Sequence, residues 1–243
     1  MSMVSVEHKK FGEVDVEVHR RDIKNIHLNV LPPNGRVRLS VPKNTSEQSI
    51  RIAIVHKLGW IKRQQADFKQ QARQSEREMV SGEAHYLWGQ KLRLEVNSTA
   101  RQHSIALKGK TKLQIEVRAG TALENKLKLL NSFYRIELQQ QLDKNLPYWE
   151  ARLGVKASAI SIRKMKTKWG SCNTDTKRIL INLELAKKPV ECLEFILVHE
   201  LVHLLERHHN KRFVALMDKH LPDWRERRNL LNSLPLAYED WSY

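Results

Sequence analysis

The stretch Leu193-Glu-Phe-Ile-Leu-Val-His-Glu-Leu-Val-His-Leu-Leu205 decides how the second half of the chain folds. Apolar residues occupy most of its positions, which predicts a helix that is buried on nearly every side. Into these apolar surroundings the sequence places His199, Glu200 and His203. Burying such groups costs on the order of several kcal/mol unless a partner compensates them, and a divalent cation would do so.

The spacing of the two histidines suits a shared metal ion. His203 follows His199 by one helical turn, so the two imidazoles are offset by about 40° and can bind one ion. Glu200 lies about 100° around the helix from His199, beside the ion, where it can accept a proton from a metal-activated water. The pattern His-Glu-x-x-His is therefore typical of a zinc metallopeptidase, with Glu200 as the general base.

A third ligand has to come from the residues after His203. Six further helical residues would rotate by about 600° and point the next ligand away, so we expect the helix to end near residues 205–207 and the chain to turn back. Asn210 suits such a turn, because asparagine tolerates left-handed backbone geometry. A catalytic zinc needs three protein ligands and an open position. Spacing alone leaves four candidates for the third ligand: Glu206, His208, His209 and Asp218.

The first half of the chain alternates polar and apolar residues as strands do, whereas the second half is mostly helical. Strand patterns occur at residues 14–18, 26–31, 37–41, 82–96, 105–107, 113–117, 159–163 and 178–182. Helical patterns cover residues 46–74, 121–145, 189–206, 211–219 and 224–231. We therefore expect an α+β protein with a mainly β region at residues 1–118, including one or two helices, and a catalytic region at residues 119–243. No internal repeat is evident.

Charge bears on the partners of the protein. The 43 Lys and Arg residues outnumber the 27 Asp and Glu residues, which gives a formal net charge of +16. Such a surface attracts polyanions such as nucleic acid, and the basic segment Lys57–Arg77 is a candidate contact. A solvated helix face and a generally basic surface explain the same residues.

Cysteine usage and hydropathy bear on the compartment. Two cysteines, Cys172 and Cys192, predict packed thiols in a reducing environment rather than a disulfide scaffold. The N-terminus has no apolar run of the length a signal peptide needs, and no stretch approaches the ~18 apolar residues of a membrane span. We therefore expect a cytoplasmic protein that does not contact a membrane.

Several stretches resemble the YgjP-like family of zinc metallopeptidases, which is related to the SprT-like and WLM proteases. They are Lys168-Trp-Gly-Ser-Cys172, Ile181-Asn-Leu183, Val198-His-Glu-Leu-Val-His-Leu204 and His209-Asn-Lys-Arg-Phe213. The resemblance extends to residues 21–30, 37–42 and 57–61 and so covers nearly the whole chain. It implies a gluzincin-like core: a helix, a short sheet, the metal helix and a following helix. The family places a histidine after five residues beyond His-Glu-x-x-His, which makes His209 the third zinc ligand; His208 is a departure, since the family often has Asn there.

The Trp169-Gly170-Ser171 turn matches the family and precedes the strand expected to line the cleft. We expect it to shape the groove for a protein or peptide substrate; a turn anchored by a buried tryptophan is the structural alternative. Two other functions stay open. One is a DNA-associated protein with a mainly structural zinc site, suggested by the net charge and by SprT-like relatives that act at DNA. The other is a metal hydrolase that cleaves a different amide or an ester.

Overall fold

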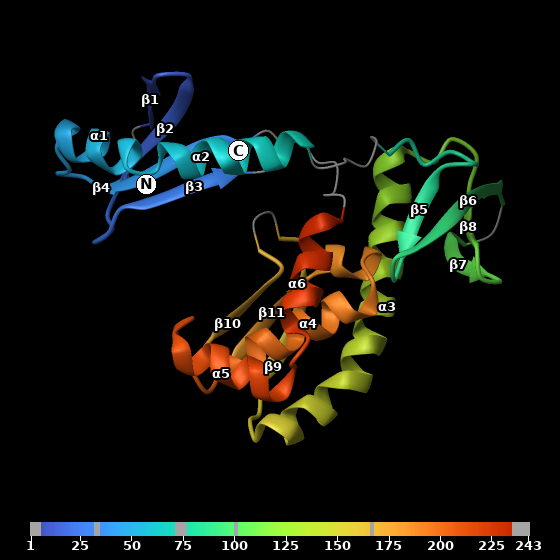
Figure 1. Cartoon of the computed structure of the whole chain (residues 1–243). Coiled ribbons are helices and arrows are strands. Elements are labelled where there is room, and N and C mark those ends of the chain that lie inside the picture. Colours follow the sequence, from blue (N-terminus) through green and yellow to red (C-terminus); the bar gives the residue numbers. More distant parts are fainter. Residues whose placement is uncertain (1–5, 32–34, 71–76, 100–101, 166–167, 235–243) are drawn as a thin grey trace. The chain divides into compact units, whose positions relative to one another are not determined.

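The computed structural model describes residues 6–31, 35–70, 77–99, 102–165 and 168–234, which form helices and strands of an α+β fold (Figure 1). The described residues divide into two compact units, of which unit 1 lies within residues 6–70 and unit 2 within residues 77–234. The boundary expected at residues 118–121 instead falls inside unit 2. The physical reason is that strands on both sides of that boundary share one hydrophobic core with the helices that follow it in the chain.

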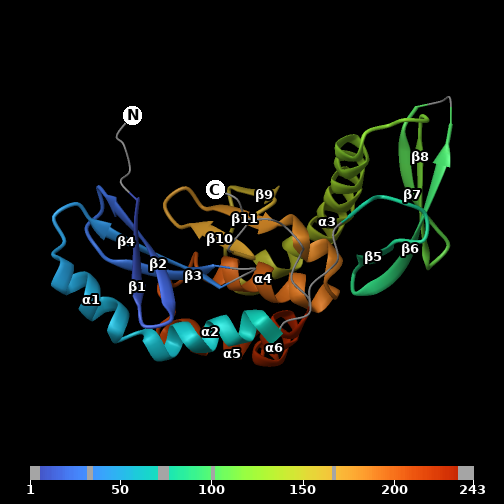
Figure 2. The same ribbon diagram turned by 90° about the horizontal axis from the view of Figure 1, so that it is seen from above.

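Unit 1 is a four-stranded sheet with two helices on one face (Figure 2). Its strands are β1 (Val6–Phe11), β2 (Val14–Arg21), β3 (His27–Leu31) and β4 (Arg36–Pro42), in the order β1-β2-β4-β3. The central pair β2 and β4 is parallel, and each outer strand forms an antiparallel hairpin with its neighbour. The helices are α1 (Glu47–Val55) and α2 (Leu58–Gln70).

The core of unit 1 follows from the alternation along β2 and β4. Their buried valines and Leu39 face Ile50, Ile54 and Ile61 of the helices. The single helix expected over residues 46–74 is two helices, since α1 ends before His56. Residues 71–74 of that expectation lie outside the described residues.

Unit 2 begins with a second four-stranded sheet. Its strands are β5 (Ala84–Leu87), β6 (Gln90–Ser98), β7 (Ser104–Lys108) and β8 (Lys112–Val117), in the order β5-β6-β8-β7. Again the central pair is parallel and each outer pair is an antiparallel hairpin.

The two four-stranded sheets have the same strand order and the same pattern of parallel and antiparallel pairs. Leu113 of β8 lies 76 residues after Val37 of β4, and α3 (Leu123–Leu153) begins 76 residues after α1. The sequence shows no internal repeat, yet the two sheets have the same arrangement of strands. They share strand pairing and apolar alternation but few residue identities, so their likeness is visible in the fold rather than in the sequence.

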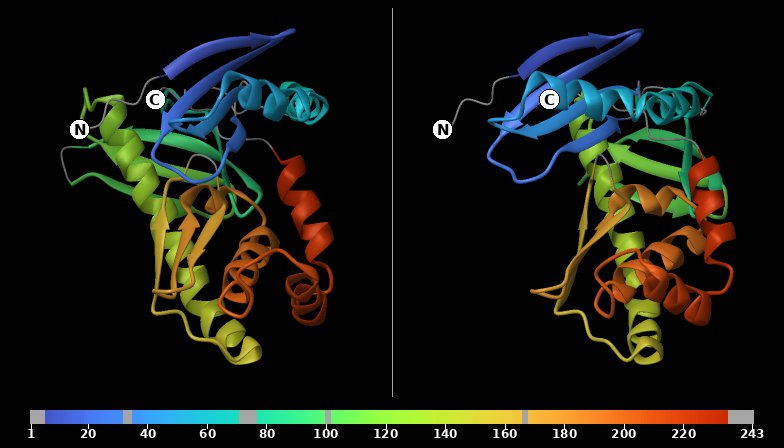
Figure 3. Two further views of the ribbon diagram at one scale, coloured as in Figure 1. Left: turned by 90° about the vertical axis from the view of Figure 1, so that its left-hand side faces the viewer. Right: turned by 60° about the vertical axis from the view of Figure 1, so that its left-hand side comes forward.

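The rest of unit 2 contains a long helix, a three-stranded sheet and the helices that follow it (Figure 3). The long helix α3 contacts β7 near one end of this unit and β9 (Ala159–Arg163) further on. β9 belongs to a three-stranded sheet with β10 (Gly170–Asn173) and β11 (Arg178–Asn182), in the order β10-β11-β9. Here β10 is an edge strand, antiparallel to β11, whereas the sequence pattern predicted only a turn-rich connection.

Four further elements complete unit 2. They are the 3₁₀ helix η1 (Leu183–Lys187), α4 (Val190–Val202), α5 (Lys211–His220) and α6 (Trp224–Ser233). Helix α4 contacts α3, α5, α6, β10 and β11, so it runs through the middle of the core. None of the helices in the described part of the chain combines the length and apolar character that a membrane span requires.

Candidate metal centre

Helix α4 carries the polar residues of the candidate site into an apolar core. Nine of its thirteen residues are buried, among them Glu200, whose side chain is 5% exposed. The helix ends at Val202, and His203 is its C-cap. The other buried residues of α4 are apolar and belong to the hydrophobic core, so His199, Glu200 and His203 lie in largely apolar surroundings.

Three imidazoles converge at the C-terminal end of α4. The Nε2 atom of His199 lies 3.2 Å from Nε2 of His203 and 3.0 Å from Nε2 of His209. All three ligand atoms lie within 4.8 Å of one another, and no other such group of His, Cys, Asp or Glu occurs among the residues that the structure describes. A tetrahedral zinc with Zn–N bonds of about 2.0–2.1 Å holds its ligand atoms roughly 3.3 Å apart. The three histidines therefore fit a single zinc ion.

The turn after α4 brings His209 into this cluster. The chain leaves the helix at His203, and Asn210 then begins α5 by accepting a 3.0 Å hydrogen bond from the backbone N–H of Phe213. Asn210 has an extended backbone, with φ −90° and ψ −172°, so the left-handed turn expected of it is wrong. Its role is that of an N-cap, for which asparagine is among the best residues.

The other candidates for the third ligand, Glu206, His208 and Asp218, lie outside the histidine cluster or form hydrogen bonds with other groups. His208 lies outside the cluster, and its backbone N–H donates to Oε1 of Glu206 at 3.2 Å. The Asp218 carboxylate accepts hydrogen bonds from Trp224 at 2.7 Å and from Arg225. The structure thus brings together the ligand set that the family resemblance implies: His199, His203 and His209.

Two neighbours fix the orientation of the imidazoles. Nδ1 of His203 lies 3.2 Å from the backbone carbonyl of Glu206, so a proton on Nδ1 leaves Nε2 free to face a metal. The buried ring of Phe213 packs against all three imidazoles, with ring centroids 4.9, 4.8 and 4.7 Å from those of His199, His203 and His209. The contact of Phe213 with the imidazoles was not predicted from the sequence. The available signal was its position three residues after Asn210, which caps the helix that follows the ligand turn.

The protonation states suit metal binding. Burial, reinforced by the two neighbouring histidines, lowers the pKa of His199 to about 3, which keeps the imidazole neutral and able to act as a ligand. Burial also lowers the pKa of His203. The pKa of Glu200 is raised to about 8 by burial, against the opposing effect of Lys168. A nearby cation stabilises the carboxylate form, so zinc would return Glu200 toward its basic state.

Gly170 lies directly against the Glu200 carboxylate. A Cβ atom at residue 170 would stand 2.5 Å from Oε1 of Glu200 and 2.9 Å from its Cδ atom. Strand β10 can thus approach the metal helix closely only because residue 170 has no side chain.

The residues of the predicted Trp169-Gly170-Ser171 turn have two different roles. Gly170 and Ser171 belong to β10 and line the groove beside the histidines. Trp169 is half-buried, packs against the hydrophobic core, and has the Lys188 ammonium 5.8 Å from its ring centroid. The glycine and serine therefore border the groove, whereas the tryptophan behaves as a structural anchor.

The groove has a volume of about 880 Å³ and contains Glu200 together with all three histidines. One wall is the β10 edge, which can offer backbone hydrogen bonds to an extended peptide. Cys172 also lines it, but burial, reinforced by Glu200, raises the pKa of this thiol to about 11. The thiol stays protonated at neutral pH, which argues against cysteine nucleophilic chemistry in this groove.

Asn182 organises the loop that leads into β10. Its side-chain N–H groups donate to the backbone carbonyls of Met165 at 2.8 Å and Lys168 at 2.7 Å. Its Oδ1 atom accepts from the N–H groups of Met165 and Glu184, and the residue is 4% exposed. Asn182 belongs to one of the stretches that resemble the YgjP-like family, but its role could not be read from that resemblance. A buried asparagine at the end of a strand, just before a tight connection, was the available signal.

Among the comparisons with known proteins, the family match covers most of the chain. A family model described as YgjP-like, metallopeptidase domain, matches residues 24–234. A search of curated proteins gives no match. Among solved structures, the metallopeptidase zymogen abylysin of Pyrococcus abyssi is 20% identical, with a TM-score of 0.34, over 39% of this chain and 90% of that chain. This structural likeness is weak.

Proposed function

Because the chain belongs to the YgjP-like metallopeptidase family, we propose that it is a zinc-dependent peptidase in which Glu200 acts as general base. His199, His203 and His209 would hold the zinc. The observation that carries the proposal is the placement of one buried carboxylate between three converging imidazoles and the β10 edge. When bound, zinc supplies a Lewis acid that polarises the scissile carbonyl and makes water a better nucleophile at neutral pH.

The residues of the chain then perform the proton transfers and the positioning. Glu200 accepts a proton from the attacking water and delivers it to the nitrogen of the leaving amine. Burial raises the pKa of Glu200 to about 8 in the metal-free site, and a bound cation would lower this pKa again, which leaves the carboxylate ready to accept the proton. Pairing of a substrate strand with β10 would hold the scissile bond beside this carboxylate.

Replacement of Glu200 by Gln tests the mechanism. Gln is isosteric but cannot act as a base, so Glu200→Gln should retain stoichiometric zinc and lose peptide hydrolysis. Glu191→Gln is the matched control, because Glu191 is exposed on the first turn of the same helix. Zinc content measured by atomic spectroscopy, together with cleavage of an unfolded protein substrate, gives both readouts. Full activity in the Glu200 variant would overturn the assignment.

Nucleic acid is a second candidate partner, favoured by the net charge of +16. The basic segment Lys57–Arg77 is the candidate contact, and one of its positive charges is already paired within unit 1, where the Lys62 ammonium lies 3.2 Å from the Glu13 carboxylate. DNA binding that weakens with salt and survives loss of His199 and His203 would support a binding protein with a mainly structural zinc site. Cleavage of an ester or a non-peptide amide, with peptides left intact, would support the alternative hydrolase.

The cytoplasm is the compartment we propose. Both cysteines are free thiols in the structure, which suits a reducing environment. Fractionation of cells that express a tagged chain would test this location.

A further inference from the structure

Four cationic side chains line the groove that contains the metal centre. They are Arg163, Lys168, Arg178 and Arg207. Among the described residues none of the four forms an ion pair with a carboxylate, although the structure contains many such pairs elsewhere. The carboxylates that line the same groove are those of Asp175 and Glu200. The groove therefore carries an excess of positive charge that the chain itself does not neutralise.

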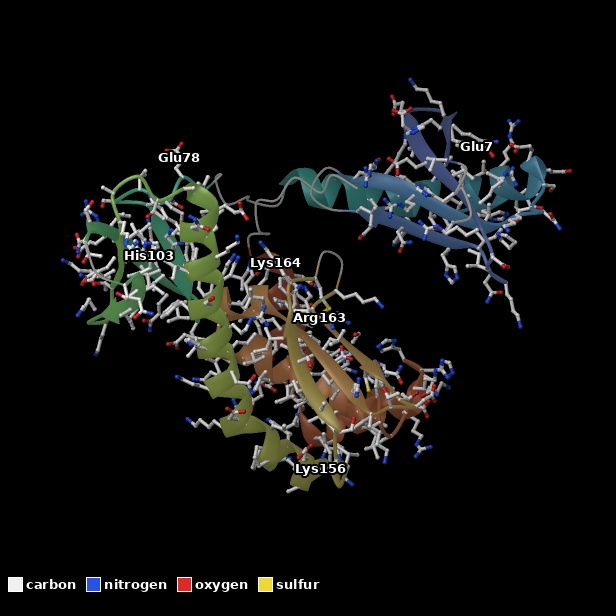
Figure 4. The ribbon with its side chains drawn as sticks, turned by 180° about the vertical axis from the view of Figure 1, so that it is seen from behind. Glu7, Glu78, His103, Lys156, Arg163 and Lys164 are labelled. Atoms are coloured by element: carbon white, nitrogen blue, oxygen red, sulfur yellow. The ribbon has the colours of Figure 1, made fainter. Side chains whose placement is uncertain are left out.

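These cations flank β10 at both of its ends. Arg163 pairs with Asn182 in the sheet, beside the Gly170 end of β10, where Lys168 also lies. Figure 4 shows Arg163 at the end of β9, away from Lys156, which lies near the start of that strand. At the other end of β10, Arg178 is directly opposite Asn173.

The fourth cation lies on the other side of the metal centre. Arg207 belongs to the turn between α4 and α5, two residues before the ligand His209. A peptide that pairs with β10 would run past the catalytic glutamate with cationic side chains before and after the scissile bond.

We propose that this groove selects peptide segments with carboxylate side chains on both sides of the scissile bond. The inference rests on the proposed peptidase function and names its substrate class. Arginine and lysine form charge-assisted hydrogen bonds with carboxylates, and a groove lined by one sign of charge concentrates ligands of the opposite sign. Each cation is exposed to solvent, so selection comes from the summed field of several charges rather than from one ion pair.

The test compares peptides that differ only in charge. One fluorogenic peptide carries Glu two residues before and two residues after the scissile bond, and its partner carries Gln at both positions. We expect the zinc-loaded enzyme to cleave the Glu peptide with a kcat/KM about tenfold higher at low salt, and the ratio to fall as ionic strength rises. Affinity for the same peptides is measured on Glu200→Gln by fluorescence anisotropy, which does not depend on turnover.

Two double variants assign the selection to the groove. Arg163→Gln with Arg178→Gln removes two charges from the groove and should abolish most of the preference for Glu. Lys108→Gln with Lys110→Gln removes the same charge from the β7–β8 hairpin, outside the groove lining, and should leave the preference intact. A preference that survives in the groove variant, or that disappears in the hairpin control, would overturn the inference.

The outcomes separate the inference from the function on which it rests. If the wild-type enzyme cleaves both peptides equally well, the peptidase function stands and the acidic selection is wrong. If it cleaves neither peptide nor any unfolded protein, the peptidase function fails. In that case the anisotropy measurement still decides whether the groove prefers the Glu peptide.

Discussion

The Cα atom of Gly170 faces the Glu200 carboxylate so closely that a methyl group would stand 2.8 Å from Cγ of Glu200 and 2.5 Å from Oε1. Thirty residues separate the two positions in the sequence, and the contact joins the edge strand β10 to the metal helix α4. The backbone of β10 thus limits where the carboxylate can lie. Because Gly170 has no side chain, the Glu200 carboxylate can lie directly against the backbone of β10.

Gly170→Ala should therefore impair catalysis without removing the metal. Accommodating the methyl group requires the carboxylate or β10 to move, and a misplacement of about 1 Å in an active site can cost on the order of 100-fold in rate. We expect kcat to fall by at least about tenfold while zinc content stays unchanged.

Gly59→Ala provides the matched control, because nothing lies within 4 Å of a Cβ atom built at this helical glycine. That substitution should leave kcat unchanged and stabilise unit 1 by roughly 0.5–1 kcal/mol. Unchanged kcat in Gly170→Ala would show that the close contact does not position the carboxylate.

The metal helix could be predicted from the sequence because its chemistry is local. His199, Glu200 and His203 lie within about one helical turn, and the apolar residues around them reveal the burial of the helix. The strands β9 and β11 were predicted with their correct bounds, since their alternating isoleucines record which face is buried.

Features that depend on distant contacts could not be predicted in this way. Residues Gly170–Asn173 have a weak strand pattern, and their extended conformation is set by pairing with β11. The role of Asn182 depends on the backbone of Met165 and Lys168, 17 and 14 residues away. The boundary between the two units is likewise set by a distant contact. The β5–β8 sheet packs into the hydrophobic core of unit 2, and local composition does not reveal this.

His209 and the adjacent His208 should behave differently toward zinc. His209→Ala removes one of three protein ligands, so we expect the zinc affinity to fall by more than about 100-fold. His208→Ala changes an exposed residue outside the ligand cluster and should leave the zinc affinity unchanged. Competition with a chromophoric chelator measures both affinities. Equal losses in the two variants would show that the turn can present either histidine to the metal.

Asn182→Asp should loosen the loop before β10. The carboxylate cannot donate to the carbonyls of Met165 and Lys168, and a buried acceptor left without a donor costs about 1–3 kcal/mol. We expect a lower free energy of unfolding, and a lower kcat at temperatures where the variant is fully folded, because Gly170 follows this loop directly.

Asn97→Asp is the control for Asn182→Asp, since Asn97 is exposed near the end of β6. Chemical denaturation and steady-state kinetics are measured on both variants. A loss of stability with an unchanged kcat would assign Asn182 a purely structural role.

Acid should destabilise unit 2 through His85. This side chain is 1% exposed; its pKa is lowered to about 4, mainly by burial and then by the Arg77 charge, while Glu83 opposes the shift and Lys187 adds to it. The unfolded chain has an ordinary histidine pKa near 6.5 and therefore binds the proton more readily than the folded chain. His85 thus contributes stability above pH 6.5 that is lost as the pH falls toward 4, up to about 3 kcal/mol.

Replacement of His85 by Gln removes this titration and should make the free energy of unfolding less dependent on pH between 6.5 and 4. The comparison uses the slope with pH rather than absolute stability, because the substitution also changes packing. Urea denaturation of both proteins with zinc present keeps the ligand histidines equivalent, so their titration contributes equally to the two slopes. Since proton uptake on unfolding sets this slope, parallel curves for wild type and variant would mean that His85 takes up no proton when the chain unfolds.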